Sequence, residues 1–315
     1  MTIKVKCLLK SRHVTANKFA TTFELYYPRA MLHEEFMTHR ALSRNASSSR
    51  AIPVETFIKQ VKDDPALPEV WGVAKKGMAD GGPMTEAGAK TALGFFLDAR
   101  DKAIAMAQQM LIQDEKPHKQ IINILLRPWE HITVVTTATE WSNFFALRRD
   151  AGAKPEFRIM ADMMWKAYQE AEVQNLKPGE WHLPYIYNHE IDSMKSARTP
   201  EKRAQALDNL IRVSAARCAR TSYRSFAGKP TAFADDIALY DKLVGQHPVH
   251  ASPTEHQCTP DTFKMKFLSV PSSDHVIVKK IKLDWDHPEL HGNFVGFNQH
   301  RKTLPGENVT DYDGE

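Results

Sequence analysis

Residues 21–50 read TTFELYYPRAMLHEEFMTHRALSRNASSSR, and this stretch contains the most informative pattern of the chain. Its first seven residues favour β-structure and end before Pro28, which predicts a strand over 20–27. Apolar side chains then recur near one face of a helix expected over 29–42, namely Met31, Leu32, Phe36 and Met37. A polar loop is expected over 43–53, so the predicted order is strand, helix, loop.

The flanking sequence supplies further elements. A strand is expected over 3–9, and a β-branched run over 132–137 fits either a strand or a buried helix segment. Helices are expected from Thr85 to about Gln113, from Pro155 and from Thr199-Pro200, because a threonine cap or a first-turn proline marks each start. Residues 62–85 are rich in proline and glycine and are predicted to be irregular, and a short strand is expected over 262–267.

Length and composition limit the class of protein. With 315 residues, 42% hydrophobic and 25% charged, the chain has ordinary globular composition and the length of about two domains. The net charge of +4 comes from scattered basic residues, which argues against a nucleic-acid partner. No apolar run is long enough to span a membrane, and the charged start does not resemble a signal peptide. Three cysteines at unrelated spacings predict no disulfide framework, so we expect a cytoplasmic protein.

The loop over 38–50 carries the side chains that a phosphate dianion needs. It combines arginine guanidinium groups with serine hydroxyls just after the predicted helix, and such donors suit a doubly charged anion. The alternative is a solvated loop whose hydroxyls close turns, and composition alone favours that interpretation.

Two other segments permit chemistry without requiring it. His247, His250 and His256 lie close in sequence, but intervening prolines break any helix that would align them, so we expect no metal site. Residues 143–149 combine an amide and two guanidinium groups with two aromatic side chains. This pattern fits a binding site and an ordinary helix end equally well. The glycine-rich nucleotide motifs and the usual hydrolase and zinc-protease motifs do not occur in the sequence.

The segment THRALSRNASSSR at 38–50 resembles the signature R-H-R-x-x-S-x-N-E-x-S-x-R of the flavin-dependent thymidylate synthases. The shared positions are His39, Arg40, Ser43, Asn45, Ser48 and Arg50. Downstream, residues 143–148 look like that family's N-F-x-x-L-R segment.

The carboxyl-terminal half is similar to the family in two more places. Residues 219–223, ARTSY, resemble its A-R-V-S-[FY] motif, and residues 250–256, HASPTEH, match its H-x-[ST]-P-x-E-H motif. Residues 292–301 look like a decayed second copy of the helix that ends in His-Arg. These motifs come first in the family and last here, which implies a duplicated or permuted member whose halves each supply part of the site.

The sequence departs from the family pattern near the expected nucleotide. Thr38 replaces the first signature arginine, Ala46 replaces the glutamate, and Ala51 replaces a tyrosine. The glutamine expected in the preceding helix is Glu35. These changes leave the base and the one-carbon chemistry open.

The resemblance implies an α/β fold of the α+β type, with a mainly antiparallel sheet flanked by helices and two related halves. We expect one half over 1–175, a linker over 176–198 and a second half over 199–315. The implied assembly is a homo-oligomer, a dimer or a tetramer, with sites at its interfaces.

The implied reaction transfers a one-carbon unit from methylenetetrahydrofolate to C5 of dUMP, with bound FAD that NADPH reduces. Arg148 is expected to polarise the base, because a guanidinium can stabilise charge that develops on a base carbonyl. Ser48, Arg50, Arg148 and Glu35 are the expected substrate contacts. The expected FAD contacts are His39, Arg40, Asn45, Asn143, Ser222, Ser252 and His256.

Two alternatives stay open. A carboxylate at Glu35 can accept from an exocyclic amine, which would favour dCMP, and hydroxymethylation of either nucleotide is a related outcome. A flavin-free nucleotide-binding paralogue is the alternative from another class, because Thr38 and Ala46 have lost functional groups.

Overall fold

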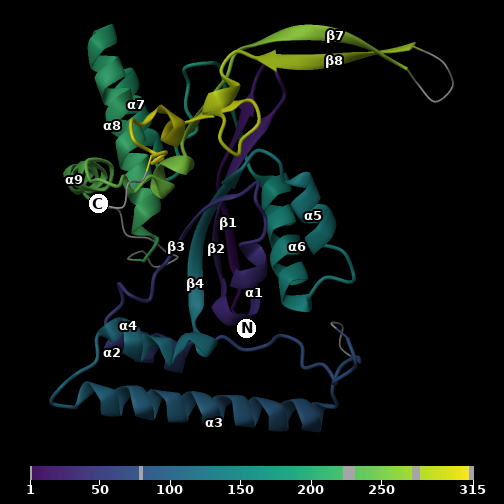
Figure 1. Cartoon of the computed structure of the whole chain (residues 1–315), viewed down its shortest axis with the longest axis vertical. Coiled ribbons are helices and arrows are strands. Elements are labelled where there is room, and N and C mark those ends of the chain that lie inside the picture. The colour runs from purple at the N-terminus through teal and green to yellow at the C-terminus, as the bar shows by residue number, and fades with distance from the viewer. Residues whose placement is uncertain (1, 78–80, 223–230, 272–276, 312–315) are drawn as a thin grey trace.

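The structure is a computed structural model that describes residues 2–77, 81–222, 231–271 and 277–311. Its centre is a five-stranded sheet in the order β3-β4-β2-β1-β5 (Figure 1). The strands are β1 (Lys4–His13), β2 (Phe19–Pro28), β3 (Ser43–Ala46), β4 (His131–Ala138) and β5 (Val173–Leu176). Every neighbouring pair is antiparallel except β1 and β5. The expected fold class is confirmed, and the ambiguous run over 132–137 is a strand.

Three helices cover one face of this sheet, α1 (Arg29–Phe36), α5 (Ser142–Arg148) and α6 (Pro155–Glu170) (Figure 1). Successive side chains of a strand point to opposite faces, so apolar residues at every second position build one hydrophobic face. In β2 these are Phe23, Leu25 and Tyr27, all fully buried in the main hydrophobic core. Helix α6 begins at Pro155, as predicted.

Helix α1 ends at Phe36, well before the end expected at residue 42. Arg44 supplies the physical reason, because its Nη1 donates to the backbone oxygens of Phe36 and His39, both at 2.9 Å. A cation on the last carbonyls stabilises a helix C-terminus. The loop expected over 43–53 is also wrong at its start. Ser43–Ala46 pairs with the edge of β4, whose backbone groups would otherwise lack partners.

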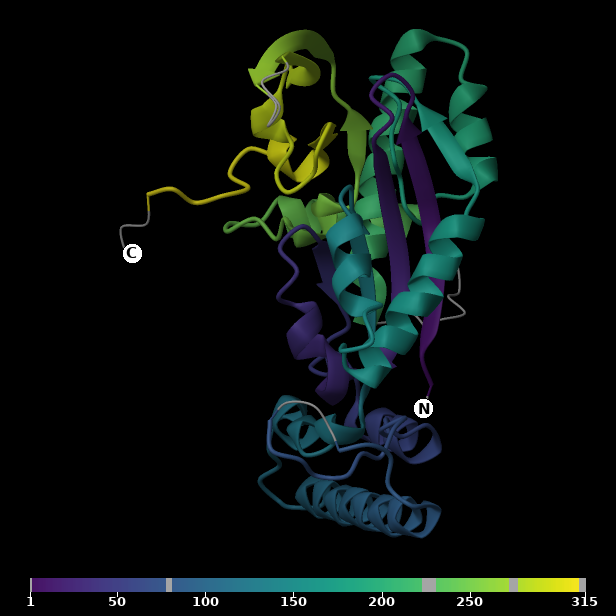
Figure 2. The same cartoon turned by 90° about the vertical axis from the view of Figure 1, so that its right-hand side faces the viewer.

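A layer of helices lies at one end of the molecule (Figures 1 and 2). It consists of α2 (Val54–Asp63), α3 (Glu86–Leu111) and α4 (Lys119–Ile124) around a second hydrophobic core. Helix α3 confirms the predicted threonine cap, since Thr85 Oγ1 accepts from Gly88 N at 3.2 Å. No helix among the described residues is long and apolar enough to cross a membrane.

The segment expected to be a linker, 176–198, begins at the last residue of β5 and contains a helix. Strand β5 completes the sheet by parallel pairing with β1, and α7 (Asn188–Lys195) follows. Between them, His182 forms an isolated bridge with Cys258, and Leu183 is buried. The segment therefore packs against both halves, while the division of the chain at 176–198 into separate halves stays a prediction.

The chain after residue 199 consists of two packed helices followed by two small antiparallel sheets. Helix α8 (Pro200–Ala219) begins at its predicted cap, since Thr199 Oγ1 accepts from Lys202 N at 3.3 Å, and α9 (Phe233–Val244) packs beside it. Two small sheets follow, β6 (Cys258–Pro260) with β9 (Phe297–Gln299), and β7 (Phe263–Pro271) with β8 (Ile277–Trp285). The predicted strand over 262–267 is thus confirmed within β7, and the relation between the halves stays a prediction.

The second face of the central sheet is buried and polar. Ser11 Oγ lies 2.7 Å from His182 Nδ1, and His182 Nε2 lies 2.8 Å from Thr22 Oγ1. Thr22 Oγ1 lies 2.6 Å from Thr137 Oγ1, which in turn lies 2.9 Å from His256 Nδ1. Buried polar groups are costly unless they are hydrogen-bonded. This chain of contacts therefore fixes how the 176–198 segment and the carboxyl-terminal half sit on the sheet.

We expect a fall in pH to destabilise the protein, because His182 and His256 resist protonation in the folded state. Burial, and then the neighbouring His256, lowers the pKa of His182 from 6.5 to about 3, and burial does the same to His256. Their contribution is fully present above pH 6.5 and is lost as the pH falls towards the folded-state value. When the pH is lowered from about 7.5 to about 5.5, each histidine should lower the free energy of unfolding by about 1.4 kcal/mol. Urea denaturation at the two pH values measures this change.

His256→Gln removes one of these groups and should remove about 1.4 kcal/mol of that pH dependence. The control is His189→Gln on the exposed surface of α7, which should keep the full dependence. An unchanged pH dependence in His256→Gln would contradict the assignment.

Candidate functional site

The ends of α1 and α5 bring three predicted site residues together. Arg148 Nη1 pairs with Glu35 Oε2 at 3.0 Å, and Arg148 Nε donates to His39 Nε2 at 2.9 Å. The guanidinium also lies 4.5 Å from the centroid of the Phe157 ring. Ion pair, hydrogen bond and ring together fix the plane of the guanidinium. Its side chain is still 20% exposed, so a ligand can reach it.

His39 is a neutral acceptor in this arrangement. Burial, and then the charges of Arg148 and Arg44, lowers its pKa from 6.5 to about 4. Because Nε2 accepts from Arg148, the proton of the neutral ring is on Nδ1. His39 therefore orients Arg148 without adding a second positive charge.

The serine loop that follows β3 is ordered by hydrogen bonds. Ser47 continues the ladder with β4, since Ser47 N donates to Thr133 O at 2.8 Å and Ser47 Oγ accepts from Thr133 N at 3.1 Å. Ser48 Oγ accepts from Arg50 N at 3.3 Å. The Ser48 hydroxyl thus closes a turn, as the solvated-loop interpretation expects, whereas the Ser47 hydroxyl extends the ladder with β4. The Arg50 guanidinium is exposed and has no hydrogen bond or ion pair among the described residues, so it is available to an anion.

The signature strand meets the carboxyl-terminal motifs in space. Strand β3 contacts the turns η2 (Arg220–Ser222) and η3 (Ser252–Glu255), and Asn45 Nδ2 donates to Cys218 O at 3.5 Å. Ser43 Oγ donates to Asn293 Oδ1 at 3.1 Å. The expected convergence of 38–50 with 250–256 is therefore confirmed, while their roles towards a cofactor stay a prediction.

The other expected cofactor residues differ in their accessibility. Arg40, Asn143 and Ser252 are exposed, and their side chains make no hydrogen bond or ion pair within the described part of the chain. His256 is fully buried, and its Nε2 has no partner among the described residues. The side chain of Ser222 lies outside the described residues.

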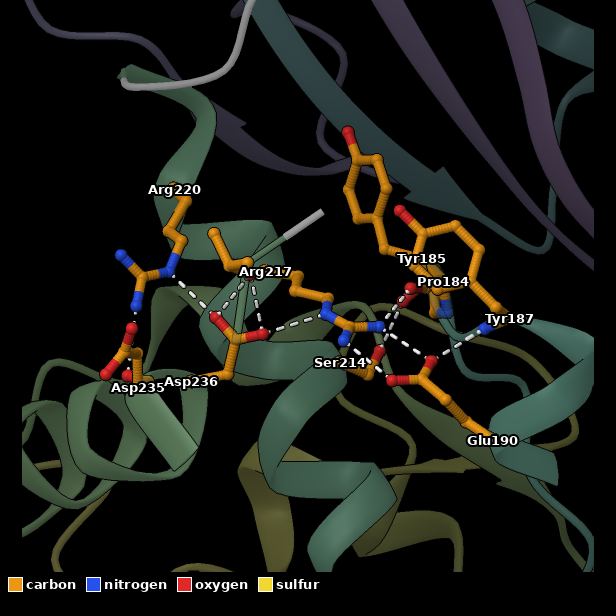
Figure 3. Close-up of polar contacts among 10 residues, drawn as sticks. Pro184, Tyr185, Tyr187, Glu190, Ser214, Arg217, Arg220, Asp235 and Asp236 are labelled. Carbon is orange, nitrogen blue, oxygen red and sulfur yellow. Dashed lines mark hydrogen bonds and ion pairs between the residues drawn. The ribbon is translucent and has the colours of Figure 1, made fainter. Parts of the chain in front are cut away.

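A buried ion network beside the ARTS turn was not anticipated from the sequence (Figure 3). Arg217, 2% exposed, lies between Glu190 Oε1 at 2.7 Å and Asp236 Oδ2 at 2.9 Å. Asp236 also accepts from Arg220 Nε at 2.8 Å and from Thr231 Oγ1. The network ties α7, α8 and α9 together and holds the first residue of η2 in place. In the sequence, this network is indicated by the three-residue spacing of Arg217 and Arg220, which places both on one side of a helical turn.

The second His-Arg pair, at 300–301, is bound within the protein. His300 Nε2 lies 2.9 Å from the Tyr240 hydroxyl, and burial lowers the pKa of His300 to about 4. Arg301 pairs with Glu255 and, at 2.6 Å, with Glu307. Its charge is neutralised, in contrast to the free guanidinium of Arg40.

The structure does not gather the three histidines at 247–256 into one group. Across the described ranges, no group of three or more histidine, cysteine or acidic side chains is placed to hold a metal ion. His256 is instead part of the hydrogen-bonded face described above.

A comparison with known protein families gives one match. The family model for thymidylate synthase complementing protein matches residues 4–172, more than half of the chain. That match spans strands β1 to β4, the 38–50 loop and the Arg148 cluster, and it stops before β5. No curated protein sequence matches the chain.

Two solved structures show weak similarity. They are crystal structures of a UMP/dUMP methylase, PolB from Streptomyces cacaoi, bound with 5-Br UMP or with 5-Br dUMP. They are 15% and 16% identical, cover 54% of this chain and 89% and 91% of their own chains, and have TM-scores of 0.45 and 0.42. The family model spans the Glu35, His39 and Arg148 cluster, and the resemblance of the 38–50 loop agrees with it. The chain belongs to the thymidylate synthase complementing protein family.

Proposed function

We propose that the chain transfers a one-carbon unit from methylenetetrahydrofolate to C5 of dUMP and forms dTMP. Family membership supports methylation of a pyrimidine nucleotide. The observation that carries the proposal is the Arg148 guanidinium, held by Glu35 and His39 within the matched region and still accessible.

Arg148 is the proposed catalytic residue because of the charge that the reaction creates. C5 becomes nucleophilic when the uracil takes on enolate character, which places negative charge on a carbonyl oxygen of the base. A guanidinium already fixed in position stabilises that charge without reorganising during the reaction. Glu35 supplies a neighbouring acceptor for the N3–H of the base, so the pair offers one donor and one acceptor to its edge.

The nucleotide phosphate is assigned to the serine loop. Arg50 offers a free guanidinium, and Ser48 sits in the same tight turn. Charge-assisted contacts from a guanidinium fork suit a phosphate better than the point charge of lysine.

Some of the expected FAD contacts are exposed and can reach the cofactor, and one is not. Arg40, Asn143 and Ser252 offer a guanidinium, an amide and a hydroxyl that other described residues do not use, and such groups can hold a diphosphate and ring edges. His39 and Asn45 lie on the same segment, with Ser222 on the η2 turn. His256 is fully buried against Thr137, so the proposal leaves it inside the protein. When bound, FAD reduced by NADPH would supply the electrons that convert the transferred methylene into a methyl group.

Glu35 is the observation that favours a second candidate substrate. Its carboxylate can accept from the exocyclic amine of cytosine as readily as from the N3–H of uracil. dCMP, with methylation or hydroxymethylation at C5, is therefore the alternative.

The proposal is tested by flavin uptake followed by product analysis. The purified chain should take up FAD and turn yellow, and with NADPH and methylenetetrahydrofolate it should convert dUMP into a product with the mass of dTMP. Conversion of dCMP alone would replace the substrate but keep the chemistry. A colourless protein that binds nucleotide and rejects FAD would overturn the proposal in favour of a flavin-free binding protein.

Arg148→Lys separates catalysis from cofactor binding. Lysine keeps the charge but loses the planar fork, so turnover should fall by about two decades while bound FAD stays unchanged. The matched control is Arg149→Lys, because Arg149 pairs with Asp162 at 2.7 Å outside the cluster. Near-normal turnover of Arg148→Lys would assign the polarising role to another group.

Arg50→Ala tests the phosphate assignment. Loss of a charge-assisted contact costs about 1.5–3 kcal/mol, so nucleotide affinity measured by calorimetry should fall by about one to two decades. FAD affinity should stay the same. Arg203→Ala, on the exposed surface of α8, is the control and should leave both affinities unchanged. Equal loss of both ligands in Arg50→Ala would refute the assignment.

A further inference from the structure

The serine loop runs from β3 to α2 and is held by side chains of α4 (Figure 1). Asn123 Nδ2 donates to the backbone oxygens of Ser49, at 2.8 Å, and of Ile52, at 3.1 Å. Lys119 Nζ donates to Ala51 O at 3.4 Å. Residues four apart on a helix lie on the same side, so Lys119 and Asn123 face the loop together. Three carbonyl groups of this turn are therefore bound to one side of α4.

Core packing alone does not explain why residue 123 is an asparagine. Its side chain is fully buried, and its neighbours Ile122 and Leu126 belong to the second hydrophobic core. A buried amide costs free energy unless it is hydrogen-bonded, whereas an apolar side chain would enter such a core without that cost. Asn123 Oδ1 has no partner among the described residues. The amide therefore contributes through Nδ2, that is, through its two bonds to the serine loop.

The first of these bonds fixes the peptide unit that joins Ser49 to Arg50. A trans peptide is planar, and its C=O and N–H groups point in opposite directions. Ser49 O accepts from Asn123. Arg50 N, at the other end of the same peptide, donates to Ser48 Oγ at 3.3 Å. The plane of this peptide therefore cannot rotate without breaking at least one of the two bonds, and Ser48 and Arg50 are held in a fixed relation to each other.

Asn123 also turns carbonyl oxygens away from the side on which an anion can bind. A carbonyl oxygen is the negative end of a peptide dipole, so it repels a phosphate. The carbonyls of Ser49 and Ile52 point to a fully buried side chain, whereas Arg50 is exposed. The solvent side of the loop thus carries the guanidinium, with two carbonyl oxygens turned inward. A loop already fixed in its binding conformation loses little entropy when a ligand binds, which favours affinity.

We propose that Asn123 is a positioning residue for the nucleotide phosphate. It does not touch the nucleotide, and it acts by holding the Ser49–Arg50 peptide so that Ser48 and the Arg50 guanidinium lie in position for the same phosphate group. The inference rests on the proposed function, which assigns the phosphate to this loop. It extends that site to α4, because Asn123 lies 74 residues after Ser49 and outside the 38–50 signature.

Two variants of the full chain test this role. Asn123→Leu keeps a branched side chain without a donor. Asn123→Asp is isosteric, so it tests the proposal if Asn123→Leu does not fold, and its carboxylate only accepts hydrogen bonds. Calorimetry measures the dissociation constant of dUMP directly and that of deoxyuridine by displacement. The ratio of the two isolates the contribution of the phosphate to affinity, and it should fall by about tenfold or more in both variants. FAD affinity should not change.

Ile122→Val is the matched control. It shortens the neighbouring buried side chain and loosens the packing of the same helix, but it leaves the amide in place. The ratio should therefore change by less than about twofold, although the variant is less stable. An equal loss of dUMP and deoxyuridine affinity in the Asn123 variants, or a fall in the ratio that Ile122→Val reproduces, would show a merely structural role and overturn the inference.

The unsubstituted chain and Arg50→Ala separate this inference from the proposed function. A ratio that Arg50→Ala lowers and that both Asn123 variants keep would overturn the inference and leave the proposed function standing. An unsubstituted chain that binds dUMP no more tightly than deoxyuridine would overturn the phosphate assignment itself, and the role of Asn123 with it.

Discussion

The buried polar face of the central sheet is the constraint on which the rest of the structure depends. Thr22 and Thr137 lie side by side on β2 and β4, and neither hydroxyl can reach water. A buried polar face is costly unless the groups that pack on it can hydrogen-bond with it. His182 from the 176–198 segment and His256 from the carboxyl-terminal half meet this requirement. This requirement explains why segments distant in sequence pack on one sheet.

The same constraint shapes the candidate site. Once the carboxyl-terminal half covers the polar face, β3 lies between that half and α1, with Asn45 towards Cys218 and Arg44 towards the end of α1. Arg44 stops the helix early, and the released segment turns back so that His39 meets Arg148. The site is thus a consequence of where α1 ends.

The arginines near the site differ in exposure and in whether a carboxylate pairs with them. The buried Arg217 and the partly exposed Arg301 are neutralised by carboxylates, whereas Arg40 and Arg50 are exposed without such partners in the described parts. Buried charges require paired partners, because an uncompensated charge in the interior is strongly destabilising. Arg40 and Arg50 both lie on the signature loop, where the proposed ligands would place their phosphates. Composition does not distinguish these two sets of arginines.

The sequence by itself determined the local features: the strands at 20–27 and 262–267, the caps at Thr85 and Thr199, and the signature that identifies the family. These depend on alternation, capping chemistry and motif spacing, all of which act over a few residues. Tertiary structure alone decided the end of α1, the strand at 43–46, the packing of the 176–198 segment and the Arg217 network. The end of α1 depends on Arg44, eight residues beyond Phe36, and the other three features depend on partners farther away in sequence. In each case a group outside the local segment, such as a cation on the helix carbonyls or an unpaired strand edge, overrides local propensity.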